Sequence, residues 1–445
     1  MNVFQGISAN DTEVFRKSYE NSALCHAMTN ALYKNSVKDV SFNSTALRDT
    51  QFQFSIDLPT LEVTDQMHSG RCWIFSALNV LREQVAKKCK LEKFELSQNY
   101  VAFWDKFEKA NYFLESAIDL ADRPADDRML SFILSSGIAD GGQWDMLVNV
   151  VEKYGVVPKA VMEETYQSSN TADMNHLLNT KLRQYAAKLR AAAKDGKDLQ
   201  AMKKEMLAEL YRFLCMCFGE PPKQFDFEYV DKDKKYHMVR GLTPKEFFRE
   251  YVGLDLRNDY VSIINSPTED KPFYRTYTVD YLGNVADGSP VHYLNLPMDE
   301  MKELIVSQLK DGELVWFGSD VGHRNEREKG LWHTEAFDFE GTFGMDFSMT
   351  KAERLDYRES AMNHAMVITG VNLDEADKPT KWKIENSWSD KHGDKGYYQM
   401  GAAWFDTFVY QAVINKKYLS TQQLKALDTT PQHLNPWDPM GTLAD

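Results

Sequence analysis

Residues 66–88 read QMHSGRCWIFSALNVLREQVAKK, and the interpretation of the whole chain depends on them. Apolar side chains recur after Cys72 at the spacing of one helix face, as at Phe75 and Leu78, so the stretch predicts an amphipathic helix that begins near Cys72. The thiol then lies in the first helical turn, where backbone N–H groups and the helix dipole stabilise a thiolate. A cysteine before an apolar helix is more often a packing residue, so its role depends on the other sequence blocks.

Further side chains complete a pattern typical of nucleophilic catalysis. Gln66 stands six residues before Cys72, and a turn between them would direct its amide at a developing oxyanion. His364 opens the strand-like run HAMVITGV, which would hold the imidazole rigidly as an acid/base group. Asn386 follows 22 residues later, so adjacent antiparallel strands would bring its oxygen to the imidazole N–H, with Trp388 shielding that bond from water.

Three blocks, QMHSGRCWIF, MNHAMVITGV and IENSWSDKHGDKGYY, resemble the active-site blocks of papain-type cysteine peptidases. The stretches SGRCW, DGGQWDM and FGSDVG, with the ending PWDPMGTLAD, resemble the narrower bleomycin hydrolase and aminopeptidase C group. The resemblance implies that Cys72 is the nucleophile, His364 its general acid/base, Asn386 the orienting group and Gln66 the oxyanion donor. It covers nearly the whole chain.

The resemblance also implies an activity, that of a cysteine aminopeptidase acting through a thioester acyl-enzyme, with bleomycin-type amide hydrolysis as a further reaction of the group. A C-terminal arm would lie in the cleft, and its last residues, Ala444 or Asp445, would meet the substrate ammonium. Gly141 and Gly142 would pair with the substrate backbone, although an ordinary turn explains two glycines equally well. The implied chemistry needs no metal or organic cofactor, and the sequence contains no HExxH or CxxC motif.

The predicted fold class is α+β, because helical patterns dominate early in the chain and strand patterns late. The resemblance specifies a papain-like, two-lobed body with a helical lobe, a β-barrel-like lobe, a helical insertion and the arm in the cleft. The expected divisions are an N-terminal extension packed on the body (1–60), the helical lobe with Cys72 (61–164), an inserted subdomain for oligomer contacts (165–300), the β-rich lobe with His364 and Asn386 (301–430) and the arm (431–445).

Composition excludes several classes of function. The formal charge of −14 argues against a surface that tracks phosphates, so nucleic acid is an unlikely partner and peptides are the expected one. The chain shows neither a basic-then-apolar leader nor an apolar run of membrane-spanning length, so no membrane association is expected. Five cysteines, an odd number, suit a reducing compartment, and the cytoplasm is the predicted location. The resemblance implies a homohexamer.

Two alternatives use the same residues differently. A catalytically silent, cage-forming scaffold would keep the fold and lose turnover, but the complete set of Gln66, Cys72, His364 and Asn386 argues against it. An amidase or acyltransferase on a papain-like fold would use the same Cys–His pair on another acyl donor. The Asn-Ser-Trp block and the C-terminal arm favour peptides.

Overall fold

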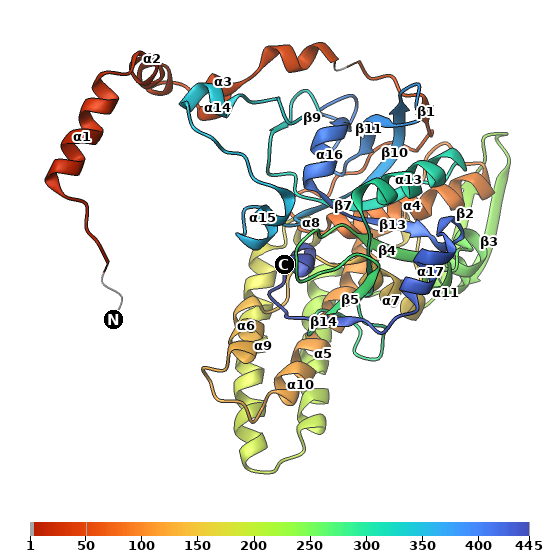
Figure 1. Ribbon diagram of the computed structural model, residues 1–445. Helices are drawn as coiled ribbons and strands as arrows, with labels where there is room; N and C mark the ends of the chain where they lie inside the picture. Colours follow the sequence, from red (N-terminus) through yellow and green to blue (C-terminus); the bar gives the residue numbers. More distant parts are fainter. Residues whose placement is uncertain (1–3, 50, 445) are drawn as a thin grey trace.

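Figure 1 shows the computed structural model, which describes residues 4–49 and 51–444. A sheet of 12 strands runs through the body in the order β14-β5-β6-β4-β13-β7-β10-β11-β12-β9-β8, and β1 pairs with β10. Its strands are β1 (Ile56–Asp57), β4 (Tyr260–Ile264), β5 (Arg275–Val279), β6 (Tyr293–Asn295), β7 (Val315–Ser319), β8 (Asn325–Glu326), β9 (Leu331–Trp332), β10 (His364–Leu373), β11 (Pro379–Glu385), β12 (Tyr397–Gly401), β13 (Val409–Asn415) and β14 (Gln432–Leu434). A separate hairpin joins β2 (Phe225–Val230) to β3 (Tyr236–Leu242).

Helices surround this sheet and extend from it. They are α1 (Ala9–Glu20), α2 (Ala23–Leu32), α3 (Val37–Ser41), α4 (Cys72–Cys89), α5 (Gln98–Asp119), α6 (Arg128–Ser136), α7 (Trp144–Tyr154), α8 (Tyr166–Ser169), α9 (Ala172–Lys194), α10 (Leu199–Phe218), α11 (Pro244–Phe247), α12 (Leu256–Asp259), α13 (Met298–Lys310), α14 (Phe339–Phe343), α15 (Lys351–Asp356), α16 (Ala402–Phe408) and α17 (Thr421–Leu427). Short helical turns are η1 (Ser44–Asp49), η2 (Lys159–Val161), η3 (Phe248–Val252), η4 (Lys416–Tyr418) and η5 (Pro439–Ala444).

The central strands divide two hydrophobic cores because successive side chains of a strand point to opposite faces. In β7, Trp316 belongs to the core that includes α4, while Phe317 belongs to the core that includes α13 and α16. Ala365 and Met366 of β10 alternate in the same way. Strand β10 thus stands between a helical side, which carries Cys72, and a second side covered by other helices. This arrangement agrees with the predicted α+β class.

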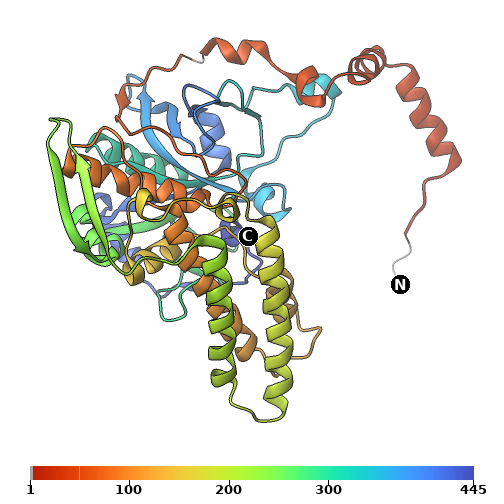
Figure 2. The ribbon, with the colours of Figure 1, turned by 180° about the vertical axis from the view of Figure 1, so that it is seen from behind.

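The helix predicted to begin near Cys72 is α4, and it ends where Lys90 takes a left-handed backbone conformation (φ 53°). The helical insertion expected within residues 165–300 includes α9 and α10, which project from the body as a hairpin (Figures 1 and 2). Both helices of this hairpin pack on α5, and Arg190 near the tip of α9 donates to the Leu120 carbonyl just after α5. Leu182 and Leu189 are among the residues that α9 buries.

The first helices differ from the expected packing of residues 1–60 on the body. Neither α1 nor α2 has a buried residue, and α1 extends away from the body in both views (Figures 1 and 2). Helix α2 contacts α14, and beyond it the Asn43 N–H donates to the Ala336 carbonyl (3.0 Å) and the Phe42 ring meets Phe337. Within residues 4–49 and 51–444, no helix has the length and apolar content needed to cross a membrane.

Two further segments differ from the sequence expectations. Strands β4 to β6 fall within the range 165–300 assigned to an insertion, yet β4 pairs with β13 in the main sheet. The run KGYYQMGAAWF reads as one strand but divides at Gly401, after which α16 begins. Trp404 and Phe405 are buried on that helix, and a short apolar run does not distinguish a buried helix from a strand by periodicity.

Candidate active site

Cys72 is the first residue of α4 and is 4% exposed. The backbone N–H of Ala365, at the start of β10, donates to Cys72 Sγ at 3.4 Å. Burial raises the pKa of the Cys72 thiol to about 11, while the N–H groups of Ala365, Trp73 and Cys72 itself act in the opposite direction. The helix start therefore places backbone donors at the sulfur, as the sequence predicted, and those donors favour the thiolate.

His364 and Asn386 meet as the strand spacing predicted. Strands β10 and β11 pair antiparallel with Val367 opposite Glu385, which brings the start of one strand beside the end of the other. His364 Nε2 donates to Asn386 Oδ1 at 2.8 Å, so Nδ1 is left for a different partner. The Trp388 ring stacks on the imidazole with centroids 4.7 Å apart. Burial lowers the pKa of His364 to about 4, although the bond to Asn386 raises it.

Gln66 lies on the same side of the cleft as Cys72, and its amide is held at two points. Ser387 Oγ donates to Gln66 Oε1 at 2.7 Å, and Gln66 Nε2 donates to the Ser69 carbonyl at 2.6 Å. An amide nitrogen carries two hydrogens, so one Nε2–H is left over for another acceptor. Met67, with φ 52°, makes the turn between Gln66 and Ser69. The structure therefore brings together Gln66, Cys72, His364, Asn386 and Trp388.

A pocket of about 440 Å³ opens between these residues. Gln66, Cys72 and Gly141 line its helical side, and His364 lines the other side together with residues 358–363. The residues that complete the lining include Thr442 and Leu443, which come from the end of the chain. The reactive pair therefore lies in a cleft that the chain's own C-terminal segment enters.

The arm is hydrogen-bonded to both walls of this cleft. Gly142 N–H donates to the Leu443 carbonyl at 3.0 Å, and Thr442 Oγ1 donates to the Met362 carbonyl at 2.8 Å. A Cβ atom on Gly141 would lie 2.3 Å from the Leu443 carbonyl oxygen, so only glycine allows the two backbones to approach this closely. The two glycines expected to face the substrate thus face the arm in this structure.

Ala444 lies next to a small cavity of about 90 Å³, whose lining also includes Lys109, Ile138 and Gly441. Ala444, the last described residue, therefore lies beside the wall of the cleft that Gly141 and Gly142 form, here called the glycine wall. Asp445, the other residue expected to contact substrate, lies outside the described residues.

Ion pairs and ring contacts fasten the arm before it enters the cleft. Lys271 Nζ lies 2.9 Å from Asp438 Oδ2, and Lys271 is almost fully buried. The Arg128 guanidinium lies over the Trp437 ring at 3.8 Å. Tyr293 donates its hydroxyl to the Met440 carbonyl at 3.0 Å. These three contacts, two of them with buried side chains of the body, fix the path of residues 437–440. The last residues of most chains, by contrast, fray.

Sequence reasoning missed a buried cluster of charges under the glycine wall. Lys106 Nζ pairs with Asp140 Oδ1 at 2.7 Å, and Lys109 Nζ pairs with Asp105 Oδ2 at 2.8 Å. All four side chains are buried. In the sequence, Asp105 and Lys109 stand four residues apart on an aromatic-rich helix, which reads as a solvent-exposed pair, so local pattern gave no signal of their burial.

Asp140 connects this cluster to the turn before Cys72. Its Oδ2 accepts from the Gly70 N–H at 3.0 Å, and its backbone carbonyl accepts from Trp73 Nε1 at 2.7 Å. Lys106 holds the pKa of the Asp140 carboxyl below its usual range despite burial, so the group is a carboxylate. Asp140 thus contacts Gly70, before Cys72 in the sequence, and Trp73, directly after it.

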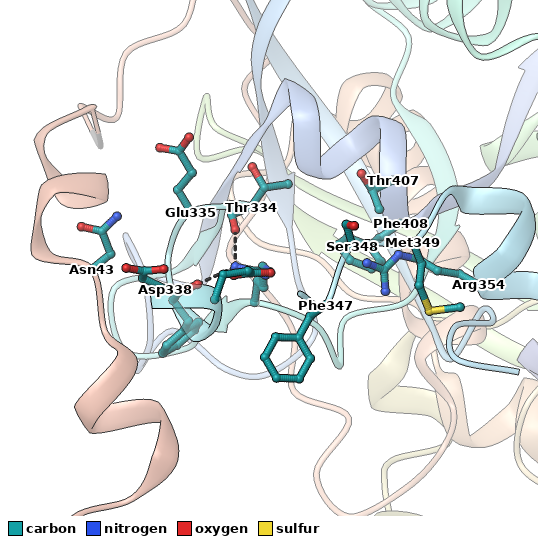
Figure 3. Close-up of a pocket in the computed structure, with 13 residues that line it drawn as sticks. Asn43, Thr334, Glu335, Asp338, Phe347, Ser348, Met349, Arg354, Thr407 and Phe408 are labelled. Carbon is teal, nitrogen blue, oxygen red and sulfur yellow. Dashed lines mark hydrogen bonds and ion pairs between the residues drawn. The ribbon is translucent and has the colours of Figure 1, made fainter. Parts of the chain in front are cut away.

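Figure 3 shows a second pocket, of about 510 Å³. It shares no lining residue with the cleft. Phe347, Met349 and Phe408 contribute apolar surface, and Asp338 contributes a carboxylate. Arg324 donates to the Thr334 carbonyl and to Glu340, so its charge is already paired. In the part of the chain that the structure describes, no cluster of three or more His, Cys, Asp or Glu side chains is arranged to hold a metal ion.

Comparison with known proteins identifies the family. The model of the Peptidase C1-like family matches residues 6–441. Aminopeptidase C of Listeria innocua is 48% identical over 438 residues, which are 98% of this chain and 99% of that protein. Aminopeptidase C of Lactobacillus delbrueckii subsp. lactis is 49% identical over 444 residues, 98% of each chain. The crystal structure of PepW from Lactobacillus rhamnosis HN001 matches with a TM-score of 0.96 at 49% identity, over 98% of this chain and 99% of that one.

The fold and the similarity lead to one assignment: the chain belongs to the Peptidase C1-like family. The resemblance to the bleomycin hydrolase and aminopeptidase C group is confirmed by the relatives named aminopeptidase C. The predicted papain-like α+β fold class is confirmed as well.

Proposed function

We propose that this protein is a cysteine aminopeptidase in which Cys72 attacks the carbonyl of the first peptide bond of a substrate. Its family and its relatives named aminopeptidase C support this class of activity. His364 receives the thiol proton, which gives a thiolate–imidazolium pair with no net change in charge. Burial disfavours each charge alone, so the pair forms when each ion has the other as its counterion.

The chemical steps use the groups that line the cleft. Thiolate attack forms a C–S bond and places negative charge on the carbonyl oxygen, where the free Gln66 Nε2–H and the Cys72 backbone N–H donate. The imidazolium of His364 then protonates the leaving amine as the C–N bond breaks. Water hydrolyses the resulting thioester, with His364 now acting as the base. Asn386 holds the ring and its tautomer throughout, and Trp388 keeps water from their bond.

The observation that carries the specificity is the arm in the cleft. With Leu443 on Gly142 and Ala444 beyond it, the arm occupies the space that a longer amino-terminal part of the substrate would need. A substrate would therefore enter with its amino terminus against the end of the arm. Gly141 and Gly142 act on the substrate indirectly, by holding the arm.

The test compares free and N-acetylated peptide amides in the full-length protein and in a chain that lacks residues 442–445. Removal of the arm should raise kcat/KM for the acetylated peptides at least ~10-fold, because the obstruction is gone, and lower it for free peptides. A papain-type epoxide inhibitor should label Cys72 in both chains. Unchanged preference would remove the arm from the mechanism, and activity in a Cys72→Ala variant would remove the thiol.

We also propose a cytoplasmic homohexamer. Its support is the large apolar side chains that α1 and the neighbouring segments expose, among them Phe4, Phe15 and Tyr33, since exposed apolar surface of this extent favours burial against other chains. The α9–α10 hairpin, which projects from the body, provides a second surface for such contacts.

A further inference from the structure

The peptide group between Gly141 and Gly142 is hydrogen-bonded at both ends. Its N–H, on Gly142, donates to the Leu443 carbonyl of the arm. Its carbonyl, on Gly141, accepts from Lys109 Nζ at 2.5 Å. A charged donor on the carbonyl polarises the amide, so the N–H on its other side becomes a stronger donor. The ammonium of Lys109 and the arm are thus connected through a single amide.

The contacts of Lys109 Nζ match those of an ammonium: burial lowers the pKa of Lys109, and the Asp105 carboxylate beside it opposes that change. Three oxygens surround the nitrogen: Asp105 Oδ2 at 2.8 Å, the Ala139 carbonyl at 3.1 Å and the Gly141 carbonyl. An ammonium carries three donors and matches these acceptors, whereas a neutral amine would direct its lone pair at one of them. Asn284 in turn donates to Asp105 Oδ1 at 3.0 Å, which holds the counterion in place.

We propose that Lys109 is a positioning residue for the C-terminal arm: its ammonium orients and polarises the Gly141–Gly142 peptide group on which Leu443 docks. This inference rests on the proposed function, in which the docked arm sets the preference for free amino termini. Lys109 belongs to α5, a helix of the body. The arm's hold in the cleft therefore depends on a buried charge far from the arm in sequence.

Lys109 Nζ also lies over the Trp73 ring, 5.2 Å from its centroid. Lys109 could therefore stabilise the core around α4 in general, and the test has to distinguish that role from positioning of the Gly141–Gly142 peptide group. A structural part would stabilise α4 and the arm together. Positioning of the peptide group predicts that the arm loosens while α4 stays protected. Removal of one charge alone would leave the other buried without a partner, so the test uses the paired substitution Asp105→Asn with Lys109→Met.

Hydrogen exchange followed by mass spectrometry on the full-length protein measures directly how well the backbone amides of the arm are protected. In the paired variant, peptides that contain Gly142 or residues 436–444 should exchange at least ~10-fold faster than in the parent, and peptides from α4 should be unchanged. The control replaces a less buried pair on other helices, Lys302→Met with Asp406→Asn, whose 2.9 Å contact joins α13 to α16. It should leave the arm's exchange unchanged.

Peptide preference provides the second reading. The ratio of kcat/KM for free over acetylated peptides should fall at least ~10-fold in the paired variant, yet change less than ~2-fold when the same substitutions are made in a chain without residues 442–445. Unchanged exchange of the arm, or equal acceleration throughout α4, overturns the proposal. A parent protein without preference for free amino termini contradicts the proposed function instead, and the exchange result still decides the role of Lys109.

Discussion

At the scale of single residues, the His364 imidazole is buried in the cleft, with the Trp388 ring stacked on it. While Cys72 keeps its thiol proton, burial lowers the pKa of His364 from the ordinary value of 6.5 to about 4. Between these values the folded protein binds fewer protons than the unfolded chain. His364 therefore contributes stability that is complete above about pH 6.5 and is lost as the pH falls toward 4.

We expect this loss to reach about 3 kcal/mol in the free energy of unfolding between pH 7 and pH 4, since one pKa unit corresponds to about 1.4 kcal/mol. Urea unfolding at the two pH values measures it. His364→Gln, which does not titrate in this range, should lose correspondingly less stability on acidification than the parent. Equal losses in the two proteins would mean that other groups dominate the acid response.

Cys72, His364 and Asn386 were predictable because each stands at the start or end of a strongly patterned element and their order in the chain matches a known reaction. Lys109 and Asp140 were not, because a charged residue on a helix is normally solvated and its burial depends on contacts with distant segments. The pairing of Val367 with Glu385 follows from a short hairpin, whereas the pairing of β4 with β13 joins strands about 150 residues apart and has no local signal.

At the scale of elements, a further buried ion pair connects α4 to β11, the strand that ends one residue before Asn386. Arg82 of α4 donates to Glu385 of β11 at 2.9 Å, and both side chains are almost fully buried. Asn79, one turn earlier on α4, donates to the same carboxylate oxygen at 2.8 Å. These bonds fix the relative position of Cys72 and Asn386 across the two sides of the cleft.

Glu385→Ala should lower the free energy of unfolding by about 3–5 kcal/mol, because the buried Arg82 guanidinium loses its partner at 2.9 Å and keeps only Glu83, at 3.5 Å. Arg82→Met with Glu385→Leu should recover most of that loss, since both charges are then replaced by apolar groups. Urea midpoints measure both effects.

The exposed pair Lys93–Glu62, at 3.1 Å, is the matched control. Its removal through Glu62→Ala should change stability by less than about 1 kcal/mol, because solvent screens exposed ion pairs. If Glu385→Ala costs no more than Glu62→Ala, the buried pair does not hold α4 on the sheet.

At the scale of the whole molecule, the amino-terminal helices and the body are distinct in their packing. Because α1 and α2 contain no buried residue, a chain that lacks residues 1–32 should keep its body folded. The same deletion should reduce the particle mass, because it removes the exposed apolar surface that we assign to contacts between subunits.

Light scattering at several protein concentrations measures the mass, and circular dichroism checks the fold. A chain lacking only residues 1–3, which keeps Phe4 and both helices, serves as the control and should assemble as the parent does. An unchanged mass after deletion of residues 1–32 would assign assembly to other surfaces, such as the α9–α10 hairpin.

The bond between Gly142 and Leu443 joins two parts of one polypeptide, and this has a kinetic consequence. A tethered segment competes for its site at an effective concentration set by the length of the tether, typically millimolar for a short flexible linker and higher for one already fastened. Neither dilution of the enzyme nor saturation with substrate changes that value. A separate peptide with the sequence of residues 442–445, added to the chain that lacks them, would have to reach such concentrations before it restored what the covalent connection provides at every dilution.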